Sequence, residues 1–290
     1  MSWKNNIVGL WQAGYEQTLQ RVAELGGADL VFTSPPYANA RTYGNDVSWT
    51  FQDYQRLGDA ILVALKPGGH CILNLDANVS QWRKGFGSER GLYPWKVMID
   101  WAERVGMRVP DRLAYCRQGL PGEYKGRFRN DWEPLLWFQR VGGTPWMDRL
   151  ALAEAARHPK KGKASSRAKD GTLIMRQRSG HAVETGIKHR GTLWQYGNVG
   201  HGHDDSCFKK VGHPARFCLA LASDVIRCFC PPNGLVVDPF LGSGTTMIAA
   251  LDNGRRFSGG DLYCRGTDRK PWVDVALEIA EDRYSQQATH

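Results

Sequence analysis

Residues 236–246 read "VVDPFLGSGTT", and this stretch decides the fold class. Its apolar start predicts a short buried strand that ends at Asp238, and its two glycines predict a sharp turn before a helix. Gly242 and Gly244 carry no side chain, so the backbone can approach a ligand closely there. The spacing differs from the G-x-x-x-x-G-K of a phosphate-binding P-loop. An acid, a glycine turn and a helix start are typical of the ligand-binding edge of an open α/β sheet.

A second acid follows the next predicted strand. That strand covers "RFSGGDL" (256–262) and contains Asp261 near its end, about twenty residues after the glycine turn. A carboxylate at this position can accept hydrogen bonds from the hydroxyls of a ribose. The two features together indicate a cofactor that contains adenosine.

The remaining elements alternate along the chain. Helical spacing of apolar residues predicts helices at 12–25, 51–65, 95–106, 215–230 and 247–254. Short apolar runs predict strands at 28–32, 70–76, 133–140, 235–238 and 256–262. This alternation predicts the α/β class, with a doubly wound, mostly parallel sheet.

The strand predicted at 28–32 leads into "TSPPY" (33–37). Pro35 and Pro36 must end the strand, because proline donates no ladder hydrogen bond and fixes φ. The tetrapeptide from Ser34 to Tyr37 is consistent with an ordinary turn. An ordinary turn accounts for most such tetrapeptides, and the alternative is a rigid backbone cradle that carries an aromatic side chain.

Positive charge gathers in one region of the chain. The net charge is +9, and residues 157–190 hold ten Lys or Arg against two acids. A charge run of this kind favours a polyanionic partner such as nucleic acid. Apolar periodicity also weakens here, so we expect an inserted recognition region at 142–205, between a first half at 1–141 and a second half at 206–290.

Other classes of protein are disfavoured. The seven cysteines form no C-x-x-C pair, so we expect mostly buried free thiols and neither a disulfide framework nor a metal site. We find no apolar run that could span a bilayer and no secretory signal in "MSWKNNIVGLWQAG" (1–14). We therefore expect a cytoplasmic protein without a membrane partner.

Three motifs in order resemble one family. "TSPPY", then "HPARF" (213–217), then "DPFLGSGTT" (238–246) are similar to the S-adenosylmethionine-dependent DNA amino-methyltransferases. The motif order resembles their permuted class, in which the catalytic motif precedes the recognition region and the cofactor loop comes last. "LKPGG", "NDWEPLLWF" and "TLWQYG" support the resemblance, which covers nearly the whole chain except about residues 142–190. It implies a Rossmann-like methyltransferase sheet.

The resemblance implies that residues 34–37 form the catalytic cradle. A base inside the DNA stack cannot be methylated, so the target nucleotide is flipped out. Tyr37 is then expected to stack on the flipped base. The Ser34 hydroxyl and the Pro35 carbonyl are expected to accept hydrogen bonds from its exocyclic amino group. Pro36 helps to stiffen the loop.

The resemblance also implies the cofactor site, with S-adenosylmethionine as cofactor and no metal. Asp261 is expected to bind the ribose. The loop around the methionine and sulfonium comprises Asp238, Phe240, Gly242, Ser243, Gly244 and Thr245. The amino-acid end is closed by His213, Pro214, Arg216 and Phe217, of which Arg216 faces the carboxylate or forms a surface ion pair. The chain departs from the family at Gly14, which precedes Tyr15 where relatives usually carry an acid; Glu16 is a candidate substitute.

The target base depends on one residue. Relatives that methylate N4 of cytosine usually carry Ser before the two prolines, so Ser34 favours cytosine N4 over adenine N6. Two further alternatives stay open: a methyltransferase that acts on RNA or protein, and a DNA-binding protein that has lost catalysis.

The expected macromolecular partner is double-stranded DNA, and a cognate restriction endonuclease is a candidate second partner. Basic residues contact phosphates and set affinity and register. The candidates for DNA contact are Arg41, Arg127, Arg129, Lys160, Lys161, Lys163 and Arg167.

Overall fold

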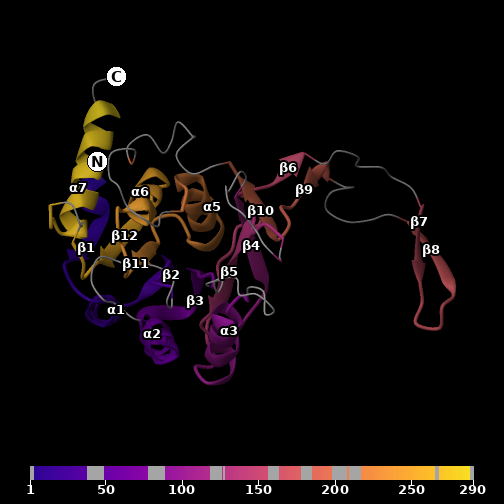
Figure 1. Ribbon diagram of the computed structural model, residues 1–290. Helices are drawn as coiled ribbons and strands as arrows, with labels where there is room; N and C mark the ends of the chain where they lie inside the picture. The colour runs from indigo at the N-terminus through magenta and orange to yellow at the C-terminus, as the bar shows by residue number, and fades with distance from the viewer. Residues whose placement is uncertain are drawn as a thin grey trace. The chain divides into compact units, whose positions relative to one another are not determined.

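The structure of the protein is a computed structural model (Figure 1). It describes residues 3–37, 49–77, 89–117, 126, 128–155, 163–177, 185–197, 208, 217–264 and 268–287. The chain divides into two compact units. The larger unit comprises Met1–Met147 with Thr192–His290, and the smaller one comprises Asp148–Gly191.

The larger unit is built on one eight-stranded sheet with the order β1-β12-β11-β2-β3-β5-β4-β10. Strand β5 runs antiparallel to both of its neighbours, and the other pairings in this sheet are parallel. The strands are β1 (Ile7–Trp11), β2 (Ala28–Thr33), β3 (Leu65–Asn74), β4 (Arg112–Arg117), β5 (Trp132–Gln139), β10 (Leu193–Tyr196), β11 (Leu235–Asp238) and β12 (Arg256–Gly260). The predicted α/β fold with a mostly parallel sheet is confirmed.

Helices cover both faces of this sheet (Figure 1). Helices α1, α2 and α3 pack against one another in series on one face, and α5 packs on α6 on the other. The helices of the described chain are α1 (Tyr15–Glu24), α2 (Phe51–Ala64), α3 (Tyr93–Glu103), α5 (Leu219–Phe229), α6 (Thr245–Asp252) and α7 (Trp272–Gln287), after a 3-10 turn, η1 (Trp3–Asn6). Sequence patterns did not predict β1, β4, β10 or α7.

The strand order reverses between β2 and β11. From β2 the chain proceeds to β3 on one side, and from β11 it proceeds to β12 on the other. The register pairs Leu30 with Val236 and Val31 with Val237. Because the two strands are parallel, their carboxyl ends meet at one edge of the sheet, where open α/β folds bind ligands.

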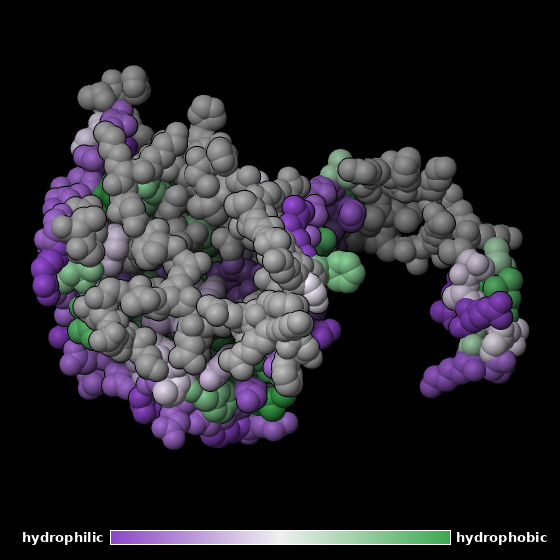
Figure 2. All heavy atoms as spheres, in the orientation of Figure 1, coloured by the Kyte–Doolittle hydropathy of each residue, from purple (hydrophilic) through white to green (hydrophobic). Residues whose placement is uncertain are grey.

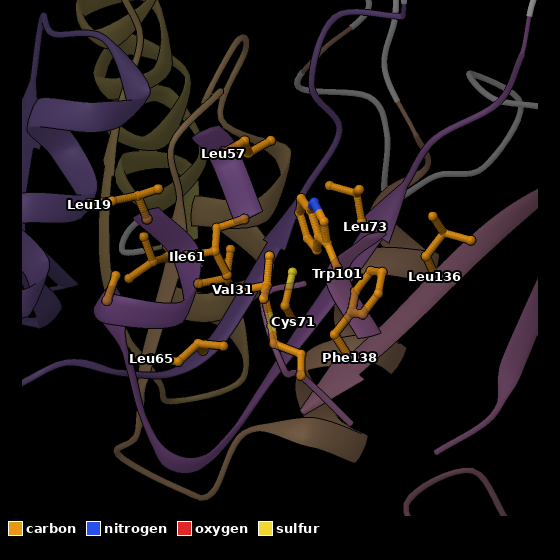
Figure 3. Close-up of a cluster of buried hydrophobic side chains, with 14 of the residues drawn as sticks. Leu19, Val31, Leu57, Ile61, Leu65, Cys71, Leu73, Trp101, Leu136 and Phe138 are labelled. Atoms are coloured by element: carbon orange, nitrogen blue, oxygen red, sulfur yellow. The ribbon is translucent and has the colours of Figure 1, made fainter. Parts of the chain in front are cut away.

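The core between the sheet and α2 is packed around Trp101 (Figure 3). The Trp101 indole from α3 is fully buried and lies 4.7 Å from the Phe138 ring. Its Nε1–H donates to the Tyr54 carbonyl of α2 at 2.9 Å. Cys71 lies in the same cluster, and burial raises the pKa of its thiol. Within the described chain four of the cysteines, including Cys71, are buried free thiols, as expected.

The smaller unit consists of two short antiparallel ribbons. Strands β6 (Glu154–Ala155) and β9 (Ile187–Lys188) form one, and β7 (Lys163–Arg167) and β8 (Leu173–Gln177) form the other. This unit, Asp148–Gly191, covers fewer residues than the recognition region expected at 142–205, because β10 belongs to the main sheet. None of the described helices has the length and apolar character needed to cross a membrane.

The packing of α2 against Trp101 generates a stability prediction. A Cβ added at Gly58 would lie 2.5 Å from Trp101 Nε1. Replacing a helical glycine with alanine normally gains about 0.5–1 kcal/mol, whereas overpacking a core costs about 1–3 kcal/mol. We therefore expect Gly58→Ala to lower the free energy of unfolding by about 1–2 kcal/mol, measured by urea denaturation. Gly197→Ala, where a Cβ meets nothing within 4 Å, is the matched control; equal midpoints for the two variants would contradict the packing argument.

Candidate active site

One buried hydrogen bond joins the two strands at the point of reversal. The Thr33 hydroxyl, at the end of β2, donates to Asp238 Oδ1, at the end of β11, at 2.6 Å. Asp238 is 2% exposed and also accepts from the Thr246 hydroxyl at 2.6 Å and the Phe240 amide at 3.0 Å. Burial raises the pKa of Asp238, and these hydrogen bonds oppose the rise. Asp238 therefore fixes the strand end, the glycine turn and the start of α6 together.

The glycine turn requires backbone angles that favour glycine. Gly242 has φ 49° and Gly244 has φ 84°, both in the left-handed region. Gly244 is the N-cap of α6, and a Cβ there would lie 2.7 Å from the Cβ of Ala276 on α7. The neighbouring Thr245 hydroxyl is buried and has no hydrogen-bond partner among the described residues. A buried polar atom beside a glycine turn fits a polar ligand.

Asp261 lies against the same turn. It is 7% exposed, and its carboxylate accepts from the Gly242 amide at 2.8 Å and the Tyr263 amide at 2.9 Å. Burial raises the pKa of Asp261 to about 6, although these two donors lower it. The carboxylate thus supports the turn through Gly242, and a carboxylate oxygen can accept a second hydrogen bond. Its role toward a ribose stays a prediction.

The SPPY segment is held from α2. Pro35 and Pro36 are buried, and the fully buried Tyr54 donates its hydroxyl to the Pro36 carbonyl at 2.7 Å. The Trp101 indole in turn holds the Tyr54 backbone. Ser34 is half-buried beside them. The loop that carries Ser34 is therefore supported from α2 by a fully buried side chain.

Tyr37 reaches two polar side chains that sequence reasoning did not single out. Its hydroxyl lies 3.3 Å from Glu133 Oε2 and 3.5 Å from Asn74 Oδ1. The Asn74 amide also donates to Glu133 Oε2, at 3.2 Å. Asn74 ends β3 and Glu133 lies at the start of the antiparallel β5, so both occupy the edge where β2 ends. The motif "NDWEPLLWF" contained Glu133 but gave no reason to choose it.

Aromatic rings gather beside the cradle. Trp49 is 7% exposed, and its ring lies 5.7 Å from Tyr15, 5.2 Å from Tyr54 and 5.4 Å from Phe240. Phe240 stacks on Tyr15 at 5.6 Å. Burial raises the pKa of Tyr15 to about 12. Phe240, which was predicted to belong to the cofactor loop, therefore also contacts α1 through Tyr15 and the segment before α2 through Trp49.

At the departure from the family, Gly14 is the N-cap of α1 and Tyr15 is the first residue of this helix. The Tyr15 hydroxyl donates to Glu16 Oε1 at 3.0 Å, and Arg56 Nε lies 3.7 Å from the same oxygen. The Glu16 side chain is 62% exposed. Glu16 is thus a surface carboxylate between Tyr15 and Arg56, and its role as a substitute acid stays a prediction.

Some of the other predicted site residues lie among the described residues, and the rest lie outside them. Phe217 is half-buried, with its ring 4.6 Å from Phe32 on β2, and Arg129 and Arg167 are exposed. Lys163 begins β7, and its side chain is not described. His213, Pro214, Arg216, Arg41, Arg127, Lys160 and Lys161 lie outside the described residues. Among the residues that are described, no three His, Cys, Asp or Glu side chains are grouped to hold a metal ion.

Residues 28–265 match the DNA methylase family N6_N4_Mtase, a range that includes both motifs at the strand reversal. The chain belongs to this family. The family predicted from the three motifs is thereby confirmed. The TSPPY and DPFLGSGTT motifs lie where β2 and β11 end.

Curated relatives match along most of the chain. The type II methyltransferase M.BglII of Bacillus subtilis is 27% identical over 260 residues, which are 87% of this chain and 63% of that protein. The orphan methyltransferase M.BamHII of Bacillus amyloliquefaciens is 28% identical over 256 residues, with coverage of 86% and 87%. This chain therefore spans less than two thirds of M.BglII and most of M.BamHII.

A solved structure confirms the fold. The PvuII DNA methyltransferase (cytosine-N4-specific) superposes with a TM-score of 0.61 at 20% identity, over 93% of this chain and 90% of that one. At this identity the likeness shows the shared arrangement of the sheet and helices. The mostly parallel sheet of this DNA methylase is thus that of a known methyltransferase structure.

The buried Asp261 generates a pH prediction. Its pKa is about 6 in the folded protein, against an ordinary value of 3.8. The folded state therefore binds the proton more tightly, so this stabilisation is present below pH 3.8 and is lost as the pH rises through 6. Relative to Asp261→Asn, we expect the free energy of unfolding of the wild type to fall by about 2 kcal/mol between pH 4 and pH 7. Urea denaturation across this range measures it. Asp282→Asn, an exposed acid on α7, is the control; parallel curves for wild type and Asp261→Asn would refute the shift.

Proposed function

We propose that this DNA methylase transfers a methyl group from S-adenosylmethionine to the exocyclic N4 of a cytosine flipped out of duplex DNA. The observation that carries the proposal is the 2.6 Å hydrogen bond between Thr33 and Asp238. It holds the end of the SPPY strand beside the glycine turn. A base on Tyr37 and a cofactor on the turn would therefore be neighbours.

The residues at the turn fit S-adenosylmethionine. The unpartnered Thr245 hydroxyl offers a buried polar contact, and the left-handed Gly244 brings backbone close to a ligand. Asp261 is the candidate for the ribose. When bound, the cofactor supplies a sulfonium methyl group that is already activated for transfer. The residues proposed to hold it are Asp238, Phe240, Gly242, Ser243, Gly244, Thr245, Asp261, His213, Pro214, Arg216 and Phe217.

The cradle residues would act on the base by position alone. Tyr37 stacks on the flipped ring, while the Ser34 hydroxyl and the Pro35 carbonyl accept hydrogen bonds from its amino group. Those acceptors draw the nitrogen lone pair out of conjugation and aim it along one direction. Positioning of this kind supplies about 7–11 kcal/mol in favourable cases. The buried prolines and the Tyr54 hydrogen bond support it, because a stiff loop loses little entropy on binding.

Cytosine is proposed as the base because Ser34 stands before the prolines. The second candidate is adenine N6, which the same fold and mechanism would serve. The family covers both chemistries.

The unit Asp148–Gly191 is proposed to contact duplex DNA. Its described residues Arg167, Lys169 and Arg176 are exposed on the β7–β8 ribbon, where Figure 2 shows hydrophilic and hydrophobic residues together. Lys160, Lys161 and Lys163 precede or begin this ribbon in the sequence. These side chains, with Arg41, Arg127 and Arg129 of the larger unit, are proposed to neutralise phosphates. The enzyme would act in the cytoplasm, and a companion endonuclease is a proposed partner.

Nucleoside mass spectrometry tests the reaction. DNA is taken from a methylation-deficient host that expresses the chain, and we expect N4-methylcytosine. Ser34→Ala should reduce it by about a hundredfold, because without this acceptor the amino nitrogen is misplaced, and Asp238→Ala should abolish it.

Each other outcome would identify another function. N6-methyladenine would keep the cofactor and mechanism and overturn the base. Methylated RNA or protein with unmodified DNA would replace the substrate. Tight DNA binding without transfer to any substrate would indicate a protein that has lost catalysis.

Salt-dependent binding tests the proposed phosphate interactions. We expect the triple change of Arg167, Lys169 and Arg176 to Gln to weaken binding to mixed-sequence duplexes uniformly. The slope of log affinity against log salt should fall by about 0.9 for each phosphate that is no longer neutralised. Lys4, Arg21 and Arg256, which are exposed on or beside η1, α1 and β12 of the larger unit, form the matched control triple. Weakened binding confined to one DNA sequence would contradict a phosphate role.

A further inference from the structure

The start of β5 carries an acid that is almost completely buried. Glu133 is 8% exposed and follows Trp132, which is 42% exposed. Burying a carboxylate is costly unless hydrogen bonds compensate for the lost water. Within β5, Glu133 precedes the fully buried Leu135 and Leu136 and pairs across the sheet with Tyr115 of β4. Packing alone would favour an apolar residue at this position.

This carboxylate is hydrogen-bonded to Tyr37 of the SPPY cradle. One oxygen, Oε2, lies 3.3 Å from the Tyr37 hydroxyl and 3.2 Å from Asn74 Nδ2. The Tyr37 hydroxyl also lies 3.5 Å from Asn74 Oδ1, so three side chains close a polar triangle. Asn74 is 3% exposed. The triangle joins the loop after β2 to the ends of β3 and β5.

We infer that Glu133 and Asn74 are positioning residues that fix the plane of the Tyr37 ring for the flipped base. The inference rests on the proposed function. A phenylalanine ring would offer a base the same stacking face, so the hydroxyl adds orientation. Without it the ring can rotate about its side-chain bonds. A ring anchored at its far end by two rigid strands presents one fixed face, and small misplacements of a bound group cost large factors in rate.

The hydrogen bonds of the triangle require an acceptor oxygen on the side chain of residue 133. The Tyr37 hydroxyl and the Asn74 amide both donate to Glu133 Oε2, and a neutral carbonyl oxygen at the same place can still accept both hydrogen bonds. Glu133→Gln therefore retains the anchor and removes only the charge. Glu133→Ala removes the oxygen that both groups contact and leaves, of the triangle, the 3.5 Å contact between the Tyr37 hydroxyl and Asn74 Oδ1. Tyr37→Phe removes the donor and keeps the ring.

The experiment measures the initial rate of methyl transfer from tritiated S-adenosylmethionine to DNA of a methylation-deficient host. We expect Glu133→Ala and Tyr37→Phe each to lower kcat by about ten- to a hundredfold. The dissociation constant for S-adenosylmethionine, measured by calorimetry, should stay within about twofold, because the triangle is separate from the glycine turn. Glu133→Gln should stay within about threefold of wild-type kcat. The double variant Tyr37→Phe/Glu133→Ala should be no slower than either single variant, since both break one anchor.

A matched control separates anchoring from strand stability. Gln139 is 4% exposed at the far end of β5, and its side chain accepts from Arg108 at 3.4 Å. Gln139→Ala should lower the unfolding temperature and leave kcat unchanged.

The inference would be overturned if Tyr37→Phe or Glu133→Ala kept the wild-type kcat, or if Glu133→Gln were as slow as Glu133→Ala. It would also be overturned if the rate effects of the two single variants multiplied in the double variant, or if Gln139→Ala lowered kcat. Absence of transfer by the wild type would instead reject the proposed function. Tyr37→Phe keeps the Glu133 carboxylate and its hydrogen bond to Asn74. This variant therefore tests the anchoring of the Tyr37 ring even if Glu133→Ala fails to fold.

Discussion

The hydrogen bond between Thr33 and Asp238 is the constraint on which the site depends. The two residues are 205 positions apart in the chain, yet their strands are direct neighbours in the sheet. The carboxylate is buried, and it is retained because three donors satisfy it at short distance. Through those donors the end of β2, the glycine turn and the first turn of α6 are fixed as one unit. Relative movement of the two motifs would break a hydrogen bond in a dry environment, which is costly.

Around this bond the cradle is supported from several directions. Tyr54 holds the Pro36 carbonyl from α2, and Trp101 holds Tyr54 from α3. Phe240 connects the glycine turn to Tyr15 and Trp49. Each support comes from an element packed on the same core, so the rigidity of the site follows from ordinary hydrophobic burial. The chemistry proposed for the site would need this rigidity, because position would be the site's main contribution to rate.

Local sequence predicted the parts of the fold whose pattern is strong. The runs at β2, β11 and β12 are buried throughout or nearly so and are bounded by proline or glycine, so both motifs were placed correctly on strand ends. Strand β1 was missed because it is only partly buried and contains Gly9, and β10 was missed because it follows the basic segment. The antiparallel direction of β5 depends on its partners and leaves no trace in its own residues. For the same reason Asn74 and Glu133 could not be paired with Tyr37 before the strand register was known.

The wide separation of β2 and β11 has a consequence for biosynthesis. Until β11 and β12 leave the ribosome, one edge of β2 has no partner in the sheet, and β1 pairs only with β12. At about 5–20 residues per second, the 205 positions between the bonded pair take roughly 10–40 s to translate. The sheet edge where β2 and β11 end is therefore completed only after β11 has been synthesised. During that interval one edge of the apolar strand β2 lacks its partner, and an open strand edge is prone to pair with other chains.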